Sequence, residues 1–334
     1  MLKRRVFSEA SAGSLEAGCP RHDWTRPEIR GIYSLPIPLL MFRAQGVHRE
    51  FHSPVEVQLC RLLSIKTGGC PEDCAYCPQS AHYETGLTRE GLRTVGEAVD
   101  AAKRAKADGA TRFCMGAAWR EAPEGAEFEQ VLEMVRGVRT LKLEVCCTLG
   151  MLTAEQARKL KAAGLTAYNH NLDTSPEFYG HVITTRSYQE RLATIGHVRR
   201  AGITVCSGGI LGMGERAEDR IGLLAELAIL DPHPESVPIN ALVRSDGTPL
   251  FHAEPLDPLA MVRTIATARI LMPRSIVRLA AGREAMSREA VTLCLLAGAN
   301  SIFTGEKLLT TPNPAMDEDR KLLRDLGMKA VSLD

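Results

Sequence analysis

The chain has 334 residues, which is enough for one large α/β domain or two smaller ones. Hydrophobic residues make up 45%, which allows a sizeable core, and 41 Lys and Arg against 40 Asp and Glu leave a net charge of +1. This balance argues against a nucleic-acid-binding or membrane-surface role, and no apolar run is long enough to span a bilayer.

The chain is rich in cysteine but shows no secretory signal, so metal binding or catalysis is favoured over a disulfide framework. The first 25 residues are polar and irregular. Lys3, Arg4 and Arg5 fit a mitochondrial transit peptide, whereas Glu9 and Asp23 oppose it, so we expect a bacterial cytoplasmic protein. The ten cysteines are Cys19, Cys60, Cys70, Cys74, Cys77, Cys114, Cys146, Cys147, Cys206 and Cys294.

After an irregular lead-in, strands and helices are expected to alternate, beginning with a strand that ends at Ile65. Helix caps support the pattern: Thr88 and Gly109 bound one expected helix, and Thr153 with Gln156 forms a capping box. The later strands are expected at 111–116, 143–148, 167–171, 204–207, 236–242, 275–279 and 301–304. The helices are expected at 89–107, 128–140, 153–163, 188–201, 217–230, 258–271, 287–297 and 317–326.

These eight strand–helix units predict a parallel sheet. Eight units in this length favour a closed (β/α)8 TIM-type barrel, with an open doubly wound sheet as the alternative. We expect residues 1–50 to form an N-terminal extension and lead-in, and residues 51–334 to form a single barrel domain. In a barrel the active site lies at the carboxyl ends of the strands, and the most distinctive loop of the sequence follows the first strand.

That loop carries three cysteines, Cys70, Cys74 and Cys77, at C-x-x-x-C-x-x-C spacing after two glycines. Thiolates are the ligands that iron–sulfur clusters and zinc prefer. Zinc sites more often use paired C-x-x-C motifs, although His82 is near enough to supply a fourth ligand. The spacing therefore favours an iron–sulfur cluster, and three ligands leave one iron of a four-iron cluster open to bind a substrate.

Three further cysteines, Cys114, Cys146 and Cys206, lie in the middle of expected strands two, three and five. Inward-pointing side chains on alternate strand positions would bring them together inside a barrel. Arg278, on expected strand seven, has apolar neighbours and needs a partner, which three thiolates or an anionic cluster would supply. Taken alone, Cys114 or Cys206 is better explained as an ordinary core residue.

Polar residues at the ends of other strands suggest a binding site. Asn169, Asn171 and Asp173 alternate at the end of strand four and are expected on one face at the barrel rim, although Asp173 also fits a helix cap. The glycine-rich run 208–215 either approaches a ligand closely or forms a tight turn. Asn240, on strand six, is either a core amide or a ligand contact.

The motif with Tyr76 before its last cysteine is the signature of radical S-adenosylmethionine enzymes, and the chain resembles the biotin synthase family most closely. The matching segments are 69–80, 168–175, 206–209, 238–240 and 281–284, within a resemblance that covers residues 51–327. It implies a barrel, usually a homodimer, that inserts sulfur into dethiobiotin after S-adenosylmethionine is cleaved to a 5′-deoxyadenosyl radical.

The resemblance also implies residue roles. Cys70, Cys74 and Cys77 would hold a 4Fe-4S cluster, whereas Cys114, Cys146, Cys206 and Arg278 would hold a 2Fe-2S cluster that donates sulfur; Cys147 would be a packing residue. S-adenosylmethionine would contact Tyr76, Asn171, Asp173, Arg191 and Ile210, and dethiobiotin would contact Asn169, Asn171 and Asn240.

A flavodoxin or ferredoxin would supply electrons. The alternatives are another radical S-adenosylmethionine barrel enzyme and a non-catalytic iron–sulfur or zinc protein.

Overall fold

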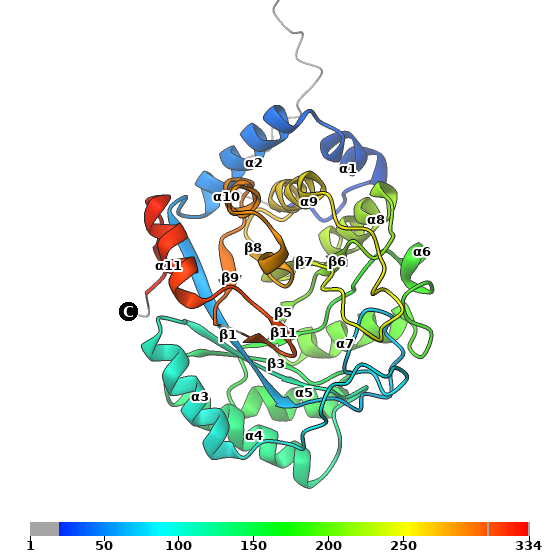
Figure 1. The fold of residues 1–334 in the computed structure, drawn as a ribbon, viewed down its shortest axis with the longest axis vertical. Coiled ribbons are helices and arrows are strands. Elements are labelled where there is room, and N and C mark those ends of the chain that lie inside the picture. The colour runs from blue at the N-terminus through cyan, green and yellow to red at the C-terminus, as the bar shows by residue number, and fades with distance from the viewer. Residues whose placement is uncertain (1–19, 306, 333–334) are drawn as a thin grey trace, which may run out of the picture.

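A closed ring of parallel strands forms the centre of the computed structural model, which describes residues 20–305 and 307–332 (Figure 1). Within this part of the chain, eight strands pair in the order β1-β2-β3-β4-β5-β7-β8-β9, and β1 pairs with β9 to close the ring. The closed (β/α)8 barrel is therefore confirmed, and the open sheet is excluded.

The strands of the ring alternate with helices along the chain. The ring is formed by β1 (Glu56–Lys66), β2 (Arg112–Ala117), β3 (Glu144–Thr148), β4 (Ala167–Asn169), β5 (Thr204–Cys206), β7 (Ser236–Ala241), β8 (Ile276–Leu279) and β9 (Ser301–Phe303). Two short strands extend it, β6 (Gly209–Leu211) beside β7 and β12 (Lys329–Ala330) beside β1. A separate antiparallel hairpin is formed by β10 (Lys307–Leu308) and β11 (Thr311–Pro312).

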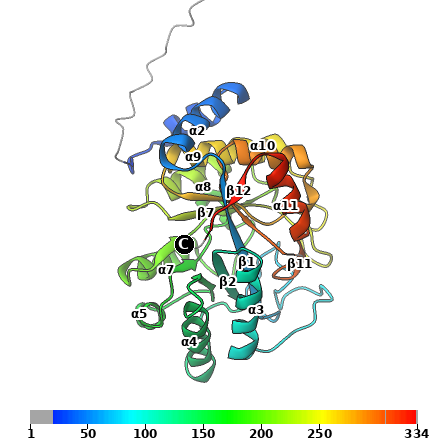
Figure 2. The same cartoon turned by 90° about the vertical axis from the view of Figure 1, so that its left-hand side faces the viewer.

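Helices cover the outside of the ring. They are α3 (Val95–Ala107), α4 (Ala126–Arg139), α5 (Ala154–Ala162), α6 (Pro176–Tyr179), α7 (Tyr188–Arg200), α8 (Ala217–Ala228), α9 (Pro258–Leu271), the short helix η1 (Arg283–Ala285), α10 (Arg288–Leu296) and α11 (Met316–Asp325). Two more helices precede the barrel, α1 (Arg26–Tyr33) and α2 (Ile37–Phe51), and they pack against α8 and α9 (Figure 2).

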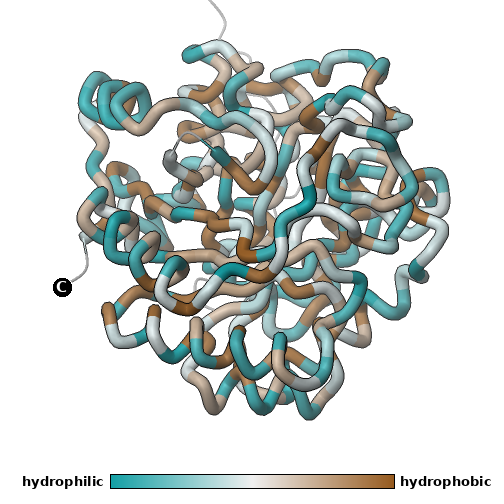
Figure 3. Tube along the Cα trace, turned by 60° about the horizontal axis from the view of Figure 1, so that its bottom comes forward, coloured by the Kyte–Doolittle hydropathy of each residue, from teal (hydrophilic) through white to brown (hydrophobic). Residues whose placement is uncertain are grey.

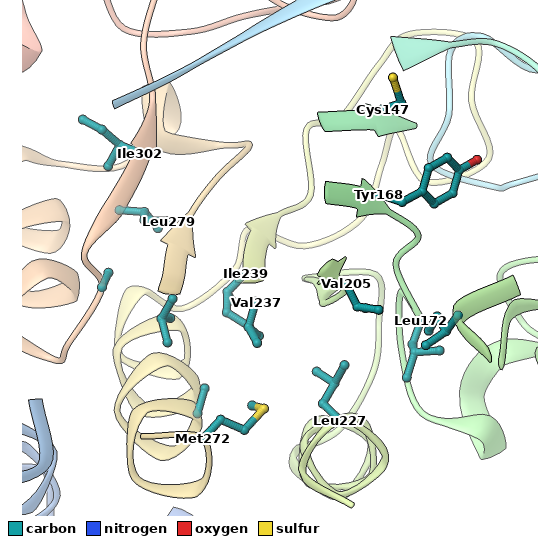
Figure 4. Packing of buried hydrophobic residues seen from close by; sticks show 14 of the residues in the cluster. Cys147, Tyr168, Leu172, Val205, Leu227, Val237, Ile239, Met272, Leu279 and Ile302 are labelled. Carbon is teal, nitrogen blue, oxygen red and sulfur yellow. The ribbon is translucent and has the colours of Figure 1, made fainter. Parts of the chain in front are cut away.

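The alternation of side chains along the strands divides the core into two layers. Outward-facing residues such as Val205, Ile239 and Leu279 pack against the helices (Figure 4). A smaller group, including Cys60, Cys114 and Cys146, lies inside the ring. Figure 3 shows hydrophobic segments along the central strands, whereas the outer helices alternate between hydrophobic and hydrophilic residues. The amphipathic helices thus bury one face on the barrel and expose the other.

Most expected elements agree with the structure to within two residues, but two expectations were wrong. The helix expected from Arg89 begins at Val95, because residues before it run alongside the first loop: Glu90 and Thr67 exchange backbone hydrogen bonds of 2.9 and 3.2 Å. The lead-in is not irregular, since it contains α1 and α2. The N-terminal tail expected from composition falls largely in residues 1–19, outside the described residues.

No helix in residues 20–305 and 307–332 combines the length and apolar character that crossing a membrane requires.

Candidate active site

The cysteine loop begins directly after β1 and closes on itself. Gly68 and Gly69 have φ angles of 74° and 71°, which a residue with a side chain rarely adopts, and they turn the chain at the end of the strand. The loop is then closed by hydrogen bonds from the backbone N of Cys70 to the carbonyl of Gln79 (2.9 Å) and from the N of Ala81 to the carbonyl of Cys70 (2.7 Å). This places the three thiols at the carboxyl end of the barrel.

Cys70, Cys74 and Cys77 all line one cavity of about 320 Å³, at the carboxyl ends of the strands. Burial raises the pKa of Cys74 to about 12 and that of Cys77 to about 11. Without a ligand, these thiols therefore carry their protons at neutral pH, and binding of iron has to displace them.

Two acidic residues inside the motif tie the loop to the segment before α7. Asp73 Oδ1 accepts hydrogen bonds from the backbone N of Thr184 (2.9 Å) and of Thr185 (3.2 Å). Burial alone would raise the pKa of Asp73, but the hydrogen bonds from both threonines lower it to about 2. Glu72, which is buried, accepts from Arg120 Nη1 at 2.9 Å and from the Thr185 hydroxyl. The loop is therefore held in place by contacts more than a hundred residues away.

The polar residues after β4 line the same cavity, as expected from their alternation. Asn169 Nδ2 donates to Asn171 Oδ1 at 3.0 Å, and the N of Gly208 donates to that same oxygen at 3.2 Å. Asp173 accepts from the Tyr76 hydroxyl at 2.8 Å, which links the strand end to the cysteine loop. Both asparagines, Asp173 and Tyr76 therefore present polar atoms to the cavity from two connected segments.

The three strand cysteines and Arg278 meet in the interior of the barrel and line the inner part of the cavity. Cys114 on β2 is the register partner of Cys146 on β3. Cys206, on β5, is the register partner of Asn169 on β4. A hydrogen bond with Cys146 and burial together raise the pKa of Cys206 well above its usual value, although the positive charge of Arg278 acts in the opposite direction. The expectation that strand alternation brings these side chains together is thus met by the geometry.

Arg278 lies deep inside this group, with 1% of its surface exposed. Its Nε donates to the Ser301 hydroxyl at 3.0 Å, and its Nη1 lies 3.6 Å from the sulfur of Cys206. Its Nη2 reaches the neutral amide oxygen of Gln58 at 3.4 Å. In the described part of the chain no carboxylate lies within ion-pair distance of this guanidinium, which therefore suits an anionic ligand held by the thiols.

The donor sets fit clusters better than a single ion. Within the described residues, no three His, Cys, Asp or Glu side chains converge closely enough to bind one metal ion. Thiolates are the usual ligands of iron–sulfur clusters, so the two sets of cysteines that line the cavity fit such clusters. His82, the alternative zinc ligand, is exposed and its Nε2 lies 3.0 Å from the carbonyl oxygen of Pro71.

Other residues named from the sequence divide into those at the cavity and those away from it. Ile210 and Asn240 line the cavity; Asn240 also bridges β7 to Gly209 (2.9 Å) and to Ala281 (3.0 Å) through its amide. Cys147 points outward among the packing residues (Figure 4).

Arg191 does not line the cavity. Its guanidinium contacts the Tyr179 hydroxyl (2.7 Å), the carbonyl of Asn171 and the carboxylate of Asp173 (2.5 Å).

Sequence reasoning missed two parts of the cavity wall. One is Arg186, which is buried; the other is the β10–β11 hairpin, whose Leu308 and Leu309 close one side. Neither part carries a sequence motif. Glu72 and Asp73, which contact the segment just before Arg186, are themselves part of the cysteine motif.

Comparison with known proteins matches two family models to the chain. The Radical SAM superfamily matches residues 64–228, and the Biotin and Thiamin Synthesis associated domain matches residues 238–329. Together the two models cover all the strands of the ring from within β1 to β9, so both contribute to one barrel.

Solved structures with the same fold include methylornithine synthase (PylB), with a TM-score of 0.76 at 20% identity over 92% of this chain and 94% of that one. The FeFe-hydrogenase maturase HydG from Carboxydothermus hydrogenoformans has a TM-score of 0.78 at 17% identity, covering 93% and 76% of the two chains. These likenesses support the fold.

Two relatives named biotin synthase are much closer in sequence. The protein of Sorangium cellulosum (strain So ce56) is 63% identical over 95% of this chain and 90% of its own length. The protein of Myxococcus xanthus (strain DK1622) is 60% identical over 93% and 90%. At this identity and coverage, together with the cysteine loop and the barrel that carries it, the chain belongs to the biotin synthase family.

Proposed function

We propose that the chain is a biotin synthase, a radical S-adenosylmethionine sulfurtransferase that converts dethiobiotin to biotin. One observation carries this proposal: the cysteine loop and the Cys114, Cys146, Cys206 and Arg278 set line the outer and inner parts of a single cavity. A substrate between them would face a site for radical generation on one side and a source of sulfur on the other.

We assign the 4Fe-4S cluster to Cys70, Cys74 and Cys77, and the 2Fe-2S cluster to Cys114, Cys146, Cys206 and Arg278. When bound, the first cluster would supply the electron that cleaves S-adenosylmethionine, and the second would supply the sulfur. For the second set, the apolar neighbours inside the ring, such as Phe303 and Leu308, keep water away from the reacting carbon.

The remaining residues bind and orient the two organic molecules. We assign Asn171, Asp173, Tyr76 and Ile210 to S-adenosylmethionine, because they border the cysteine loop. Arg191 supports this group from behind the cavity by holding Asp173.

We assign Asn169, Asn171 and Asn240 to dethiobiotin. Amide groups pair well with a cyclic urea, because both carry N–H donors and a carbonyl acceptor.

We also propose the partners of the enzyme. The electron comes from a flavodoxin or ferredoxin, because reductive cleavage of S-adenosylmethionine consumes an electron that a separate reductant has to provide. The chain works as a homodimer, which is supported by exposed apolar side chains on adjacent helices, Phe42 of α2 (80% exposed) and Leu296 of α10 (48% exposed). Its relatives are bacterial, which supports a bacterial enzyme of the cytoplasm; residues 51–334 act as one domain.

An anaerobic assay tests the function. The full chain, reconstituted with iron and sulfide, is incubated with S-adenosylmethionine, dethiobiotin and a reductant, and biotin is measured by mass spectrometry. We expect biotin from the natural chain and none from Cys70→Ala, with Cys147→Ala as a matched control that keeps activity. Cleavage of S-adenosylmethionine without biotin would point instead to a related radical enzyme with another substrate.

A further inference from the structure

Arg186 is a buried cation without a matching partner. It is 8% exposed and lines the cavity, and among the described residues its Nε has no hydrogen-bond partner. The nearest carboxylate oxygen to this Nε is Oε1 of Glu72, at 4.0 Å. That distance is too long for a hydrogen bond. A buried guanidinium that lacks hydrogen bonds is costly, so this geometry indicates an anionic ligand in the cavity.

Glu72 does not hydrogen bond to Arg186, because its two oxygens are already engaged. Oε1 accepts from Arg120 Nη1 at 2.9 Å, and Oε2 accepts from the hydroxyl of Thr185. Arg120 in turn reaches Glu190 at 3.2 Å. The guanidinium of Arg186 therefore makes no hydrogen bond to either carboxylate and is left to face the cavity.

The cysteine loop itself fixes the position of Arg186. Asp73, which stands between two of the cysteines, accepts hydrogen bonds from the backbone N of Thr184 and Thr185, the two residues before Arg186. The guanidinium is thereby held at a set place relative to the thiols. Its charge favours the thiolate forms of Cys70 and Cys74, although burial still raises the pKa of both.

The other buried arginine near the loop, Arg191, does not direct a free positive charge toward the cavity. Arg191 is paired at 2.5 Å with Asp173, and both side chains are at most 4% exposed. The ion pair cancels most of its charge as seen from the cavity. Of these two buried arginines, Arg186 is thus the one that no carboxylate neutralises at hydrogen-bonding distance.

We infer that Arg186 offsets the negative charge of the iron–sulfur cluster held by Cys70, Cys74 and Cys77 and makes that cluster easier to reduce. The inference rests on the proposed function, which assigns the cluster to these thiols. Adding one electron makes the cluster more negative, and a fixed positive charge in a poorly solvated site stabilises the reduced form. Arg186 therefore influences electron transfer to the cluster through its charge, without binding the iron itself.

The test is the reduction potential of the reconstituted full chain, measured without S-adenosylmethionine by titration with titanium(III) citrate and followed by electron paramagnetic resonance. Arg186→Met should disfavour reduction at least tenfold, which is 59 mV for one electron. Arg186→Lys should stay near the natural value, because it keeps the charge. Glu72→Gln should shift the potential in the opposite direction, because it removes the carboxylate nearest Arg186.

Arg89→Met serves as the matched control, since Arg89 is exposed and packs on the outer side of Gly68 and Gly69. It should leave the potential unchanged. An unchanged potential in a fully loaded Arg186→Met chain would overturn the inference, as would shifts of the same sign in Arg186→Met and Glu72→Gln. If the natural chain binds the four-iron cluster but makes no biotin, the proposed function is refuted, whereas the comparison of reduction potentials still tests the role of Arg186. If the natural chain binds no four-iron cluster, both the proposed function and the role of Arg186 are refuted.

Discussion

The buried ion pair between Asp173 and Arg191 offers a sharp test of the structure. Asp173→Asn preserves the shape of the side chain and tolerates the left-handed backbone at this position, where φ is 66°. The pair is 2.5 Å apart, and its side chains are 3% and 4% exposed, so solvent screens it little. The substitution leaves Arg191 buried and unpaired, which should lower the free energy of unfolding by about 3–5 kcal/mol.

Urea unfolding of the cluster-free chain, followed by far-ultraviolet circular dichroism, measures this loss. The double variant Asp173→Asn, Arg191→Met removes both charges and should be about 1–3 kcal/mol more stable than Asp173→Asn alone. A loss below about 1 kcal/mol in the single variant, or additive losses in the double variant, would refute the reasoning. Asp246→Asn, a change at an exposed loop position, is a control that should have little effect.

Three further predictions concern the thiols and two histidines. Cys70→Ala should abolish release of 5′-deoxyadenosine, measured by chromatography; release at the natural rate would contradict the assignment. Cys206→Ala should lose the visible absorbance of a 2Fe-2S cluster and the formation of biotin while some cleavage survives, and an unchanged biotin yield would contradict it. Burial, with the nearby charge of Arg269, lowers the pKa of His48 and of His52 to about 4. The unfolded chain binds these protons near pH 6.5, so stability should be complete above that pH and fall toward pH 4. Thermal unfolding from pH 7 to pH 4 checks this, and a variant with glutamine at both positions should lose less stability; parallel curves would refute it.

Local chemistry was enough to predict many of the elements. The Thr153 capping box forms as expected: the N of Gln156 donates to Thr153 Oγ1 at 3.2 Å, and the N of Thr153 donates to Gln156 Oε1 at 3.0 Å. Thr88, an equally good cap by sequence, does not start a helix, because the residues after it pair with the base of the cysteine loop. That pairing depends on the folded barrel and leaves no local signal.

The two N-terminal helices show a signal that was present but not used. Thr25 and Glu28 form a capping box at the start of α1. Pro36 and Pro38 flank the start of α2, where proline is favourable because the first helical N–H groups need no partner. Both helix starts therefore carry local signals that the expectation of an irregular lead-in does not take into account.

The candidate site was predictable where strand geometry decides it. Alternation along β2, β3 and β5 indicated that cysteines of these strands could meet inside the ring, and the family resemblance selected Cys146 over Cys147; the structure brings Cys114, Cys146 and Cys206 to the cavity. The contact of Glu72 with Thr185 was not predictable, since the two residues are 113 positions apart and both lie in loops. Loop-to-loop contacts follow from how the barrel closes, so the surroundings of Arg186 required the structure.

The pairing of β1 with β9 also governs when the two metal sites can be completed during synthesis of the chain. Cys70 leaves the ribosome long before Ser301–Phe303, yet these late residues must bond to Gln58–Cys60 before the ring is closed. Arg278, a member of the inner set, is likewise made late. A nascent chain thus carries these thiols beside an open strand edge, so in the proposed enzyme the inner cluster site would be complete only after the whole ring has been made.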